Sequence, residues 1–212
     1  MNLKILLLRR VYLTLLILCT TTAFSQSQCF EIQSILVDAC EGDGDEGLNE
    51  MVRFKIGNAP LNTNQMNVNF PSNSWGGLIQ NASTAQKVNL INQEILAAGG
   101  CGQILEPTNG VLPANATVIL VTSHLFDVAL NPFGAMNETI FIIFQNSVAT
   151  GGHFGNFGTS AMRTLTISFG SCSDTVSYNR SLLIDENGNN AAGNGATVEF
   201  DSNGVASYVN NG

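Results

Sequence analysis

The strongest constraint on the fold is a succession of short apolar runs, each of strand length, that are separated by turn sequences. In one of them Val52, Phe54 and Ile56 alternate with Arg53 and Lys55, so one face of the segment is apolar and the other is charged. Such alternation is typical of a β-strand with one buried face. The sequence contains about ten runs of this length, which predicts a mainly β protein.

Other runs predict the place of their strands in a sheet. The segments Thr117–Val121 and Asn137–Gln145 are almost continuously apolar, as expected of central strands that are covered on both faces. The run at 29–37 alternates imperfectly around Gln33 and Ser34, which is the pattern that a β-bulge produces. Because the next run begins shortly afterwards, we expect the two strands to be antiparallel neighbours.

Two pairs of runs predict β-hairpins. Ala196–Phe200 and Val205–Val209 are joined by Asp-Ser-Asn-Gly, a turn sequence, and Met162–Phe169 is followed by Thr175–Tyr178 after a Gly-containing turn. The sequence shows no internal repeat and no linker. We therefore predict one domain with the architecture of an antiparallel β-sandwich.

A single segment has helical rather than strand periodicity. Val88, Ile91 and Ile95 recur at helical spacing within Ser83–Ala97, a serine or threonine at the start can cap the helix, and two glycines follow its end. We expect one helix inserted into the β-sandwich, laid across its end.

The amino-terminal residues have the features of a signal peptide. Lys4, Arg9 and Arg10 precede an apolar run, and small residues precede an expected cleavage after Ser25. This predicts a signal peptide at 1–25, a mature domain at 26–212, and a secreted or cell-surface protein without membrane insertion after cleavage. The alternatives are a membrane anchor, for which the apolar run is shorter than the roughly 20 residues required, and a lipoprotein modified at Cys19.

The charge of the chain excludes one class of partner. The whole sequence has a net charge of −8, and removal of three cations with the signal peptide leaves five Lys and Arg against 16 Asp and Glu, a net charge of −11. A surface this acidic repels nucleic acids and anionic lipids. We expect no nucleic-acid partner.

Four cysteines remain in the expected mature chain, namely Cys29, Cys40, Cys101 and Cys172. An even number in an exported protein predicts two disulfides. The sequence has no Cys-x-x-Cys and no paired His, which argues against a zinc site. Of the three possible pairings we favour Cys40 with Cys101 and Cys29 with Cys172, because both connect the ends of strands that are far apart in the sequence.

The segment between the first two predicted strands is rich in acidic residues, since 38–50 carries six of the 16 carboxylates. Carboxylates this close must be hydrated or hold a cation. The two hypotheses are a solvated acidic loop and a calcium site, and we expect no other cofactor. The candidate calcium ligands are Asp38, Asp43, Asp45, Glu46 and Glu50.

The sequence lacks the motifs of the common enzyme classes. It has no Gly-x-Ser-x-Gly, no His-Glu-x-x-His, no phosphate-binding loop and no dinucleotide fingerprint, and His124 and His153 are its only histidines. We therefore predict a non-catalytic module. The alternative is a carbohydrate-active hydrolase that uses a carboxylate pair, which leaves no local motif. Glu50 is the first carboxylate to test for that activity.

Three segments resemble the lamin-tail domain as it occurs in secreted proteins of Bacteroidetes-type bacteria. They are the opening strand Ile32–Asp38, the acidic residue and strand of Asn49–Phe54, and the turn and apolar strand of Gly110–Leu120. The resemblance implies an immunoglobulin-like sandwich, a scaffolding or adhesive role, and no catalytic residues. It also implies a surface protein or a glycan as partner, and a place within a longer surface protein.

Overall fold

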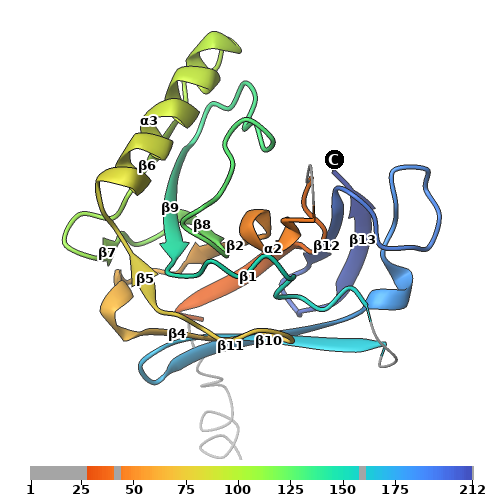
Figure 1. Cartoon of the computed structure of the whole chain (residues 1–212). Coiled ribbons are helices and arrows are strands. Elements are labelled where there is room, and N and C mark those ends of the chain that lie inside the picture. The colour runs from red at the N-terminus through yellow and green to blue at the C-terminus, as the bar shows by residue number, and fades with distance from the viewer. Residues whose placement is uncertain (1–27, 41–43, 158–160, 212) are drawn as a thin grey trace, which may run out of the picture.

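The computed structural model describes residues 28–40, 44–157 and 161–211 (Figure 1). The expected signal peptide and Asp43 lie outside these residues. The chain is mainly β, as the sequence predicts, and its described strands form three sheets. In this part of the chain no helix is long and apolar enough to cross a membrane.

The largest sheet has eight strands. Seven follow one another in the order β13-β12-β1-β2-β8-β9-β5, and β6 also pairs with β9. In chain order these strands are β1 (Phe30–Leu36), β2 (Met51–Ile56), β5 (Leu78–Ile79), β6 (Gln103–Leu105), β8 (Thr117–Val121), β9 (Thr139–Gln145), β12 (Ala196–Phe200) and β13 (Ala206–Asn210).

The second sheet has three strands in the order β11-β10-β4, and a third sheet is a short pair of β3 with β7. Their bounds are β3 (Leu61–Asn62), β4 (Met66–Asn69), β7 (Val111–Leu112), β10 (Met162–Phe169) and β11 (Cys172–Asn179). The helical elements are α2 (Glu46–Asn49), α3 (Ala82–Ala97) and the 3-10 turns η1 (Thr63–Gln65) and η2 (Arg180–Leu182).

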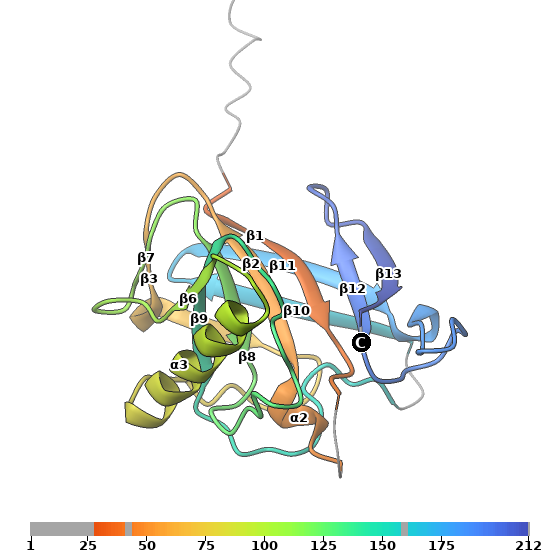
Figure 2. The same ribbon diagram turned by 90° about the horizontal axis from the view of Figure 1, so that it is seen from above.

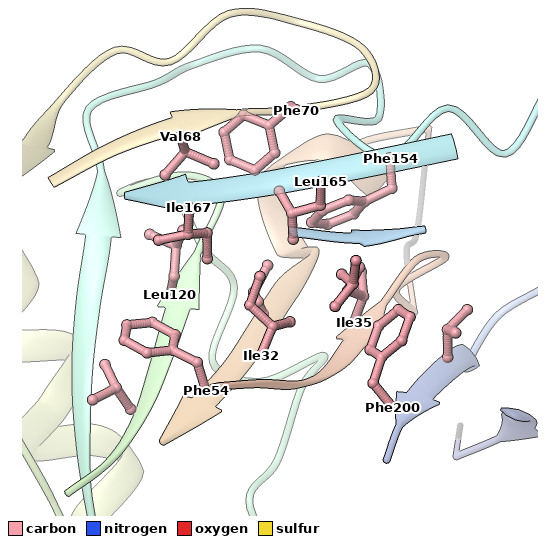
Figure 3. Packing of buried hydrophobic residues seen from close by; sticks show 14 of the residues in the cluster. Ile32, Ile35, Phe54, Val68, Phe70, Leu120, Phe154, Leu165, Ile167 and Phe200 are labelled. Atoms are coloured by element: carbon pink, nitrogen blue, oxygen red, sulfur yellow. The ribbon is translucent and has the colours of Figure 1, made fainter. Parts of the chain in front are cut away.

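The main hydrophobic core lies between the two larger sheets. Phe54 and Leu120 of the eight-stranded sheet and Ile167 of the three-stranded sheet belong to one buried cluster (Figure 3). The ring of Phe30 lies 5.8 Å from that of Phe54 and 5.2 Å from that of Phe169, edge to face in both cases. The two sheets therefore share a single core, as the predicted sandwich requires.

A second core covers the opposite face of the eight-stranded sheet. Helix α3 buries Val88, Ile91 and Ile95 against residues of β6, β8 and β9. Figures 1 and 2 show α3 on one side of this sheet and β10 and β11 on the other. The helix thus covers a sheet face rather than the end of a sandwich, and the prediction that β8 and β9 are covered on both faces is confirmed.

The local strand predictions are largely confirmed. β1 and β2 are antiparallel neighbours, and their register shifts between Ile32 and Ser34, where the bulge is expected. Val52, Phe54 and Ile56 are buried. Both predicted hairpins, β10 with β11 and β12 with β13, are present.

Two details of the strand pattern and the cap of the helix differ from the predictions. β8 pairs with β9 in parallel, as does β6, although we expected antiparallel pairing throughout. The strand expected over 61–70 is interrupted by η1. The cap of α3 is Asn81, whose side chain accepts hydrogen bonds from the backbone N–H of Ser83 and of Thr84.

One of the two predicted disulfides is confirmed. Cys29 and Cys172 are bonded, which links the start of β1 to the start of β11 across the main core. The predicted bond between Cys40 and Cys101 is wrong, because both residues are free cysteines. Cys101 is exposed beside Asn137, with its Sγ 3.3 Å from the Asn137 Oδ1, whereas Cys40 follows β1 and lines a hollow with Leu36 and Met51.

Candidate functional site

The acidic segment between β1 and β2 is packed against a second segment, 150–157, that follows β9. Helix α2 brings Gly47 so close to this segment that its N–H donates to the Thr150 carbonyl oxygen over 2.8 Å. A Cβ atom at Gly47 would collide with the Gly151 carbonyl group. A glycine is therefore required for the close approach of the two backbones.

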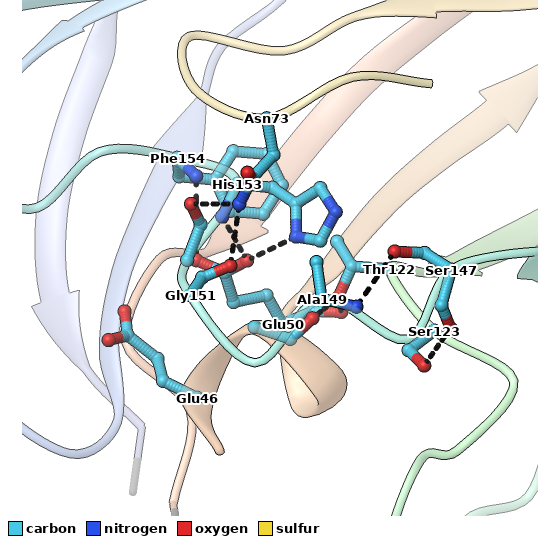
Figure 4. Close-up of polar contacts among 12 residues, drawn as sticks. Glu46, Glu50, Asn73, Thr122, Ser123, Ser147, Ala149, Gly151, His153 and Phe154 are labelled. Carbon is cyan, nitrogen blue, oxygen red and sulfur yellow. Dashed lines mark hydrogen bonds and ion pairs between the residues drawn. The ribbon is translucent and has the colours of Figure 1, made fainter. Parts of the chain in front are cut away.

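Glu50 is the residue at which the two segments are joined. Its side chain is fully buried at the start of β2, and its Oε2 accepts hydrogen bonds from the backbone N–H of His153 over 2.6 Å and from the His153 Nδ1 over 3.2 Å (Figure 4). Its Oε1 accepts a longer bond, of 3.4 Å, from the N–H of Phe154. The carboxyl group thus bonds the backbone of a segment more than 100 residues away.

Gln145 fixes the orientation and the tautomer of the His153 ring. The Gln145 Nε2 donates to the Ser74 carbonyl oxygen over 3.3 Å and lies 3.2 Å from the His153 Nε2. Since an amide nitrogen only donates, the His153 Nε2 is the acceptor, and the ring proton resides on Nδ1 and points to Glu50. All three side chains are buried.

Burial favours the neutral forms of both titratable groups. The pKa of Glu50 is raised to about 8, mainly by removal from water; the two backbone N–H groups oppose this rise, and the charge of Asp38 adds a smaller contribution to it. Burial also lowers the pKa of His153 to about 4. At neutral pH the contact is therefore a hydrogen bond between two uncharged groups rather than an ion pair.

Polar side chains from several elements hold the segment that contains His153. The Asn73 amide donates to the carbonyl oxygens of Gly151 and Gly152, over 2.7 and 3.0 Å. Further along, three side chains of β10, β11 and η2 donate to the carbonyl oxygens of 154–156. These donors are the Tyr178 hydroxyl to Phe154 over 2.6 Å, the Arg163 Nε to Gly155 over 2.6 Å and the Arg180 Nη1 to Asn156 over 3.0 Å.

Two of the predicted calcium ligands meet at Asn156. The amide nitrogen of Asn156 donates to the Asp38 Oδ2 over 2.9 Å and to the Glu46 Oε1 over 2.6 Å. Asp45 is exposed, and Glu50 is buried with its oxygens bound to N–H groups. Within the described residues, no three His, Cys, Asp or Glu side chains are grouped as a metal ion requires. Calcium binding at this segment stays an untested hypothesis, the alternative to a solvated acidic loop.

The sequence identifies Glu50 as the residue to test but gives no sign of its partner. His153 lies in a Gly-rich segment with no local motif, and its contact with Glu50 spans 103 positions. The other histidine, His124, has a buried Nδ1 without a hydrogen-bond partner among the described residues. Trp75 is partly buried and packs against the main core.

No family model, curated protein or solved structure matches the chain. The resemblance to the lamin-tail domain is therefore neither supported nor contradicted by these comparisons.

The geometry of the buried pair limits what it can do chemically. A general acid or base must lie within hydrogen-bond reach of the substrate group that it serves. Glu50 and His153 have no exposed surface, and their polar atoms are bound to one another, to backbone N–H groups and to Gln145. In this conformation the pair stabilises the junction of two segments and has no route to a substrate.

Proposed function

We propose that the chain is an exported, non-catalytic structural or interaction module, of the adhesive or scaffolding kind, whose partner is a surface protein or a glycan. The observation that carries this proposal is the burial of Glu50 and His153. An acid and imidazole pair with a raised carboxyl pKa is the arrangement that would otherwise suggest catalysis. Here the pair of Glu50 and His153 is buried and joins two segments of the chain, so it does not support an enzyme.

The rival hypothesis is a hydrolase that uses a carboxylate pair. Such an enzyme places two carboxyl groups on either side of the scissile bond, about 5 to 10 Å apart, in an open cleft. Glu46 and Asp38 are near neighbours of the buried pair, but both bind the amide of Asn156. Glu50, which has the raised pKa of a general acid, has no surface to offer to a sugar.

Export is supported by two observations of different kinds. The amino-terminal sequence predicts a signal peptide, and the bond between Cys29 and Cys172 suits an oxidising compartment outside the cytoplasm.

The proposal is tested by incubating the purified domain with a panel of glycans and measuring both retention and hydrolysis. We expect retention on at least one surface glycan and no hydrolysis. Glu50→Gln keeps the shape of the side chain, and Glu138→Gln, at an exposed position paired with Arg53, is the matched control. Hydrolysis that is abolished by Glu50→Gln but not by Glu138→Gln would refute the proposal.

A further inference from the structure

The eight-stranded sheet ends at β13, which is paired with a described strand on one side only (Figure 2). Two hydrogen bonds at the ends of its pairing with β12 show which backbone groups are used. The N–H of Asp201 donates to the Val205 carbonyl oxygen over 3.1 Å, and the N–H of Asn211 donates to the Gly195 carbonyl oxygen over 2.9 Å. Hydrogen-bonded and non-hydrogen-bonded pairs alternate along an antiparallel ladder. These bonds therefore fix the direction of the N–H and C=O groups throughout β13.

Ala206 and Tyr208 direct their backbone groups away from β12. They form non-hydrogen-bonded pairs with Phe200 and Val198, whereas Ser207, between them, directs its N–H and C=O groups toward β12. Among the described residues, the backbone groups of Ala206 and Tyr208 have no hydrogen-bond partner. Both residues are partly exposed, and Ser207 is exposed. The outer edge of β13 thus offers two donors and two acceptors.

The other edges of the two larger sheets are short or already bonded. β5, at the opposite end of the eight-stranded sheet, has two residues, and β4, at one end of the three-stranded sheet, has four. β11 is longer, but two of its outward amides are bound. The N–H of Thr175 donates to the Asp174 Oδ1 over 2.8 Å, and the N–H of Asn179 donates to the Tyr208 hydroxyl over 2.7 Å. Of these edges, β13 is the one best able to accept a further strand.

The sequence of β13 lacks the features that keep an exposed edge from pairing. Such edges usually carry a lysine, a proline, a β-bulge or an inward-pointing charge. β13 reads Ala-Ser-Tyr-Val-Asn and pairs with β12 in unbroken register from Ala206 to Asn210. The side chains of Ala206 and Tyr208 pack against the main core. An added strand with apolar side chains on that face would extend the core as well as the sheet.

Carboxylates lie along this edge and at both of its ends. Glu199 is exposed and lies opposite Ser207. Asp201 belongs to the turn that precedes β13. Asp185 lies near the other end, where the Asn210 amide donates to the carbonyl oxygen of the preceding residue over 3.0 Å. Backbone hydrogen bonds lower the pKa of Asp201 and of Asp185, so both are ionised at neutral pH.

The cations near these carboxylates are bound elsewhere. Arg180 is next in sequence to Asn179, which contacts Tyr208, but its Nη1 donates to the Asn156 carbonyl oxygen over 3.0 Å. Arg53 lies on the same row of the sheet as Glu199, two strands away, and pairs with Glu138 over 3.2 Å. The surroundings of the β13 edge are therefore negatively charged.

We propose that the outer edge of β13 binds an extended, basic segment of a partner protein as an added strand. The backbone of the segment pairs with the free N–H and C=O groups of Ala206 and Tyr208, as in other cases of strand addition. Its apolar side chains lie beside those two residues. Its lysines, at the alternate positions, lie beside Ser207, which is small enough to let them reach Glu199. The inference rests on the proposed function, since it names one class of partner protein.

Other occupants fit this edge less well. The chain has a net charge of −8, and pairing of β13 with a second copy would bring the Glu199 and Asp201 carboxylates of both copies toward one another. An acidic peptide would meet the same repulsion. A glycan has no regular series of amide donors and acceptors with which to pair.

The test is isothermal titration of the purified domain with the peptide acetyl-Lys-Val-Lys-Val-Lys-Val-Lys-amide. We expect binding of one peptide per chain, weakened by added salt, and no binding of the same peptide with glutamate in place of lysine. Only alternate amides of an added strand face β13. Of two peptides, one N-methylated at every valine and one at every lysine, one should therefore lose binding and the other should keep it.

Variants of the domain test the same contacts from the other side. Ala206→Pro removes an outward N–H at an edge position where proline is tolerated, and should weaken binding by at least about tenfold. Ala206→Val keeps this N–H and is the matched control. Glu199→Gln should weaken binding by about threefold, whereas Glu106→Gln, beyond the end of β6, should leave it unchanged. Melting curves verify that the variants fold, and the N-methylated peptides decide the matter if Ala206→Pro does not.

Four outcomes would overturn the inference. They are no binding of the lysine peptide, equal binding of the glutamate peptide, equal effects of the two N-methylations, and binding that a folded Ala206→Pro variant leaves unchanged. A dimer in light scattering without peptide, dissociated by Ala206→Pro, would also overturn it and assign the edge to a second copy. None of these results contradicts the proposed function, which fails only if the chain hydrolyses a glycan through Glu50.

Discussion

At the scale of single residues, the contact between Glu50 and His153 makes stability depend on pH in a specific way. Glu50 has a pKa of about 8 in the folded chain against an ordinary value of 4.5, so between these values the folded state holds a proton that the unfolded state has lost. This contribution to stability therefore falls as the pH rises. His153, with a pKa lowered from 6.5 to about 4, contributes stability that rises with pH over that range.

These two effects oppose each other between about pH 4.5 and 6.5, and only the Glu50 effect remains above that range. We expect this pair to lower the free energy of unfolding by about 2 kcal/mol between pH 6.5 and 8. Urea denaturation of the wild type and of Glu50→Gln at several pH values measures the difference. The variant should lack the loss above pH 6.5, and parallel pH profiles for the two proteins would show that Glu50 does not titrate as described.

At the scale of elements, the start of α3 is stabilised by Asn81 rather than by the residues that the sequence suggests. The Asn81 side chain accepts from two backbone N–H groups, and the Thr84 hydroxyl accepts from the N–H of Asn81, which completes a capping box. The helix buries three apolar residues over the second core, so loss of the cap should destabilise the whole domain and not only the first turn.

Asn81→Ala should lower the free energy of unfolding by about 1 kcal/mol, because it leaves two N–H groups without their acceptor. Ser83→Ala is the matched control, since Ser83 is exposed and contributes only its backbone N–H to the cap. Chemical denaturation measures both variants. A larger effect of Ser83→Ala than of Asn81→Ala would contradict this assignment of the cap.

Patterns within single elements were predictable from the sequence, and contacts between distant elements were not. Alternation identifies the buried face of β2, and the break around Gln33 identifies the bulge of β1, because both are local consequences of strand geometry. The parallel pairing of β8 with β9 depends on how the intervening chain crosses the sheet, which periodicity does not record. For the same reason the sequence does not indicate the role of His153, because its contact with Glu50 is purely tertiary.

At the scale of the whole molecule, the disulfide between Cys29 and Cys172 closes most of the described chain into one loop, with a sequence separation of 143. The even number of cysteines led to the prediction of a second bond, but Cys40 and Cys101 are placed by elements that do not bring them together. Counting cysteines predicts how many bonds are possible, whereas the packing of the sheets decides which ones form.

Removal of the disulfide should destabilise the domain strongly. For a loop of this length, the chain-entropy model gives a contribution of about 5 kcal/mol. Replacement of Cys29 and Cys172 by serine should therefore lower the melting temperature clearly, whereas the same change at Cys40 and Cys101 should leave it almost unchanged. Equal effects of the two double variants in calorimetry would contradict the assignment of the bond.

The central claim, that Glu50 and His153 form a closed structural tie and not a reactive site, is tested most directly by ¹⁵N NMR of the His153 ring. Because the ring is buried and its Nδ1 proton is bound to Glu50, we predict the neutral Nδ1–H tautomer throughout pH 5 to 8, with slow exchange of that proton with water. A ring that titrates near pH 6.5 and exchanges its proton rapidly would be open to solvent and substrate, and would contradict the account.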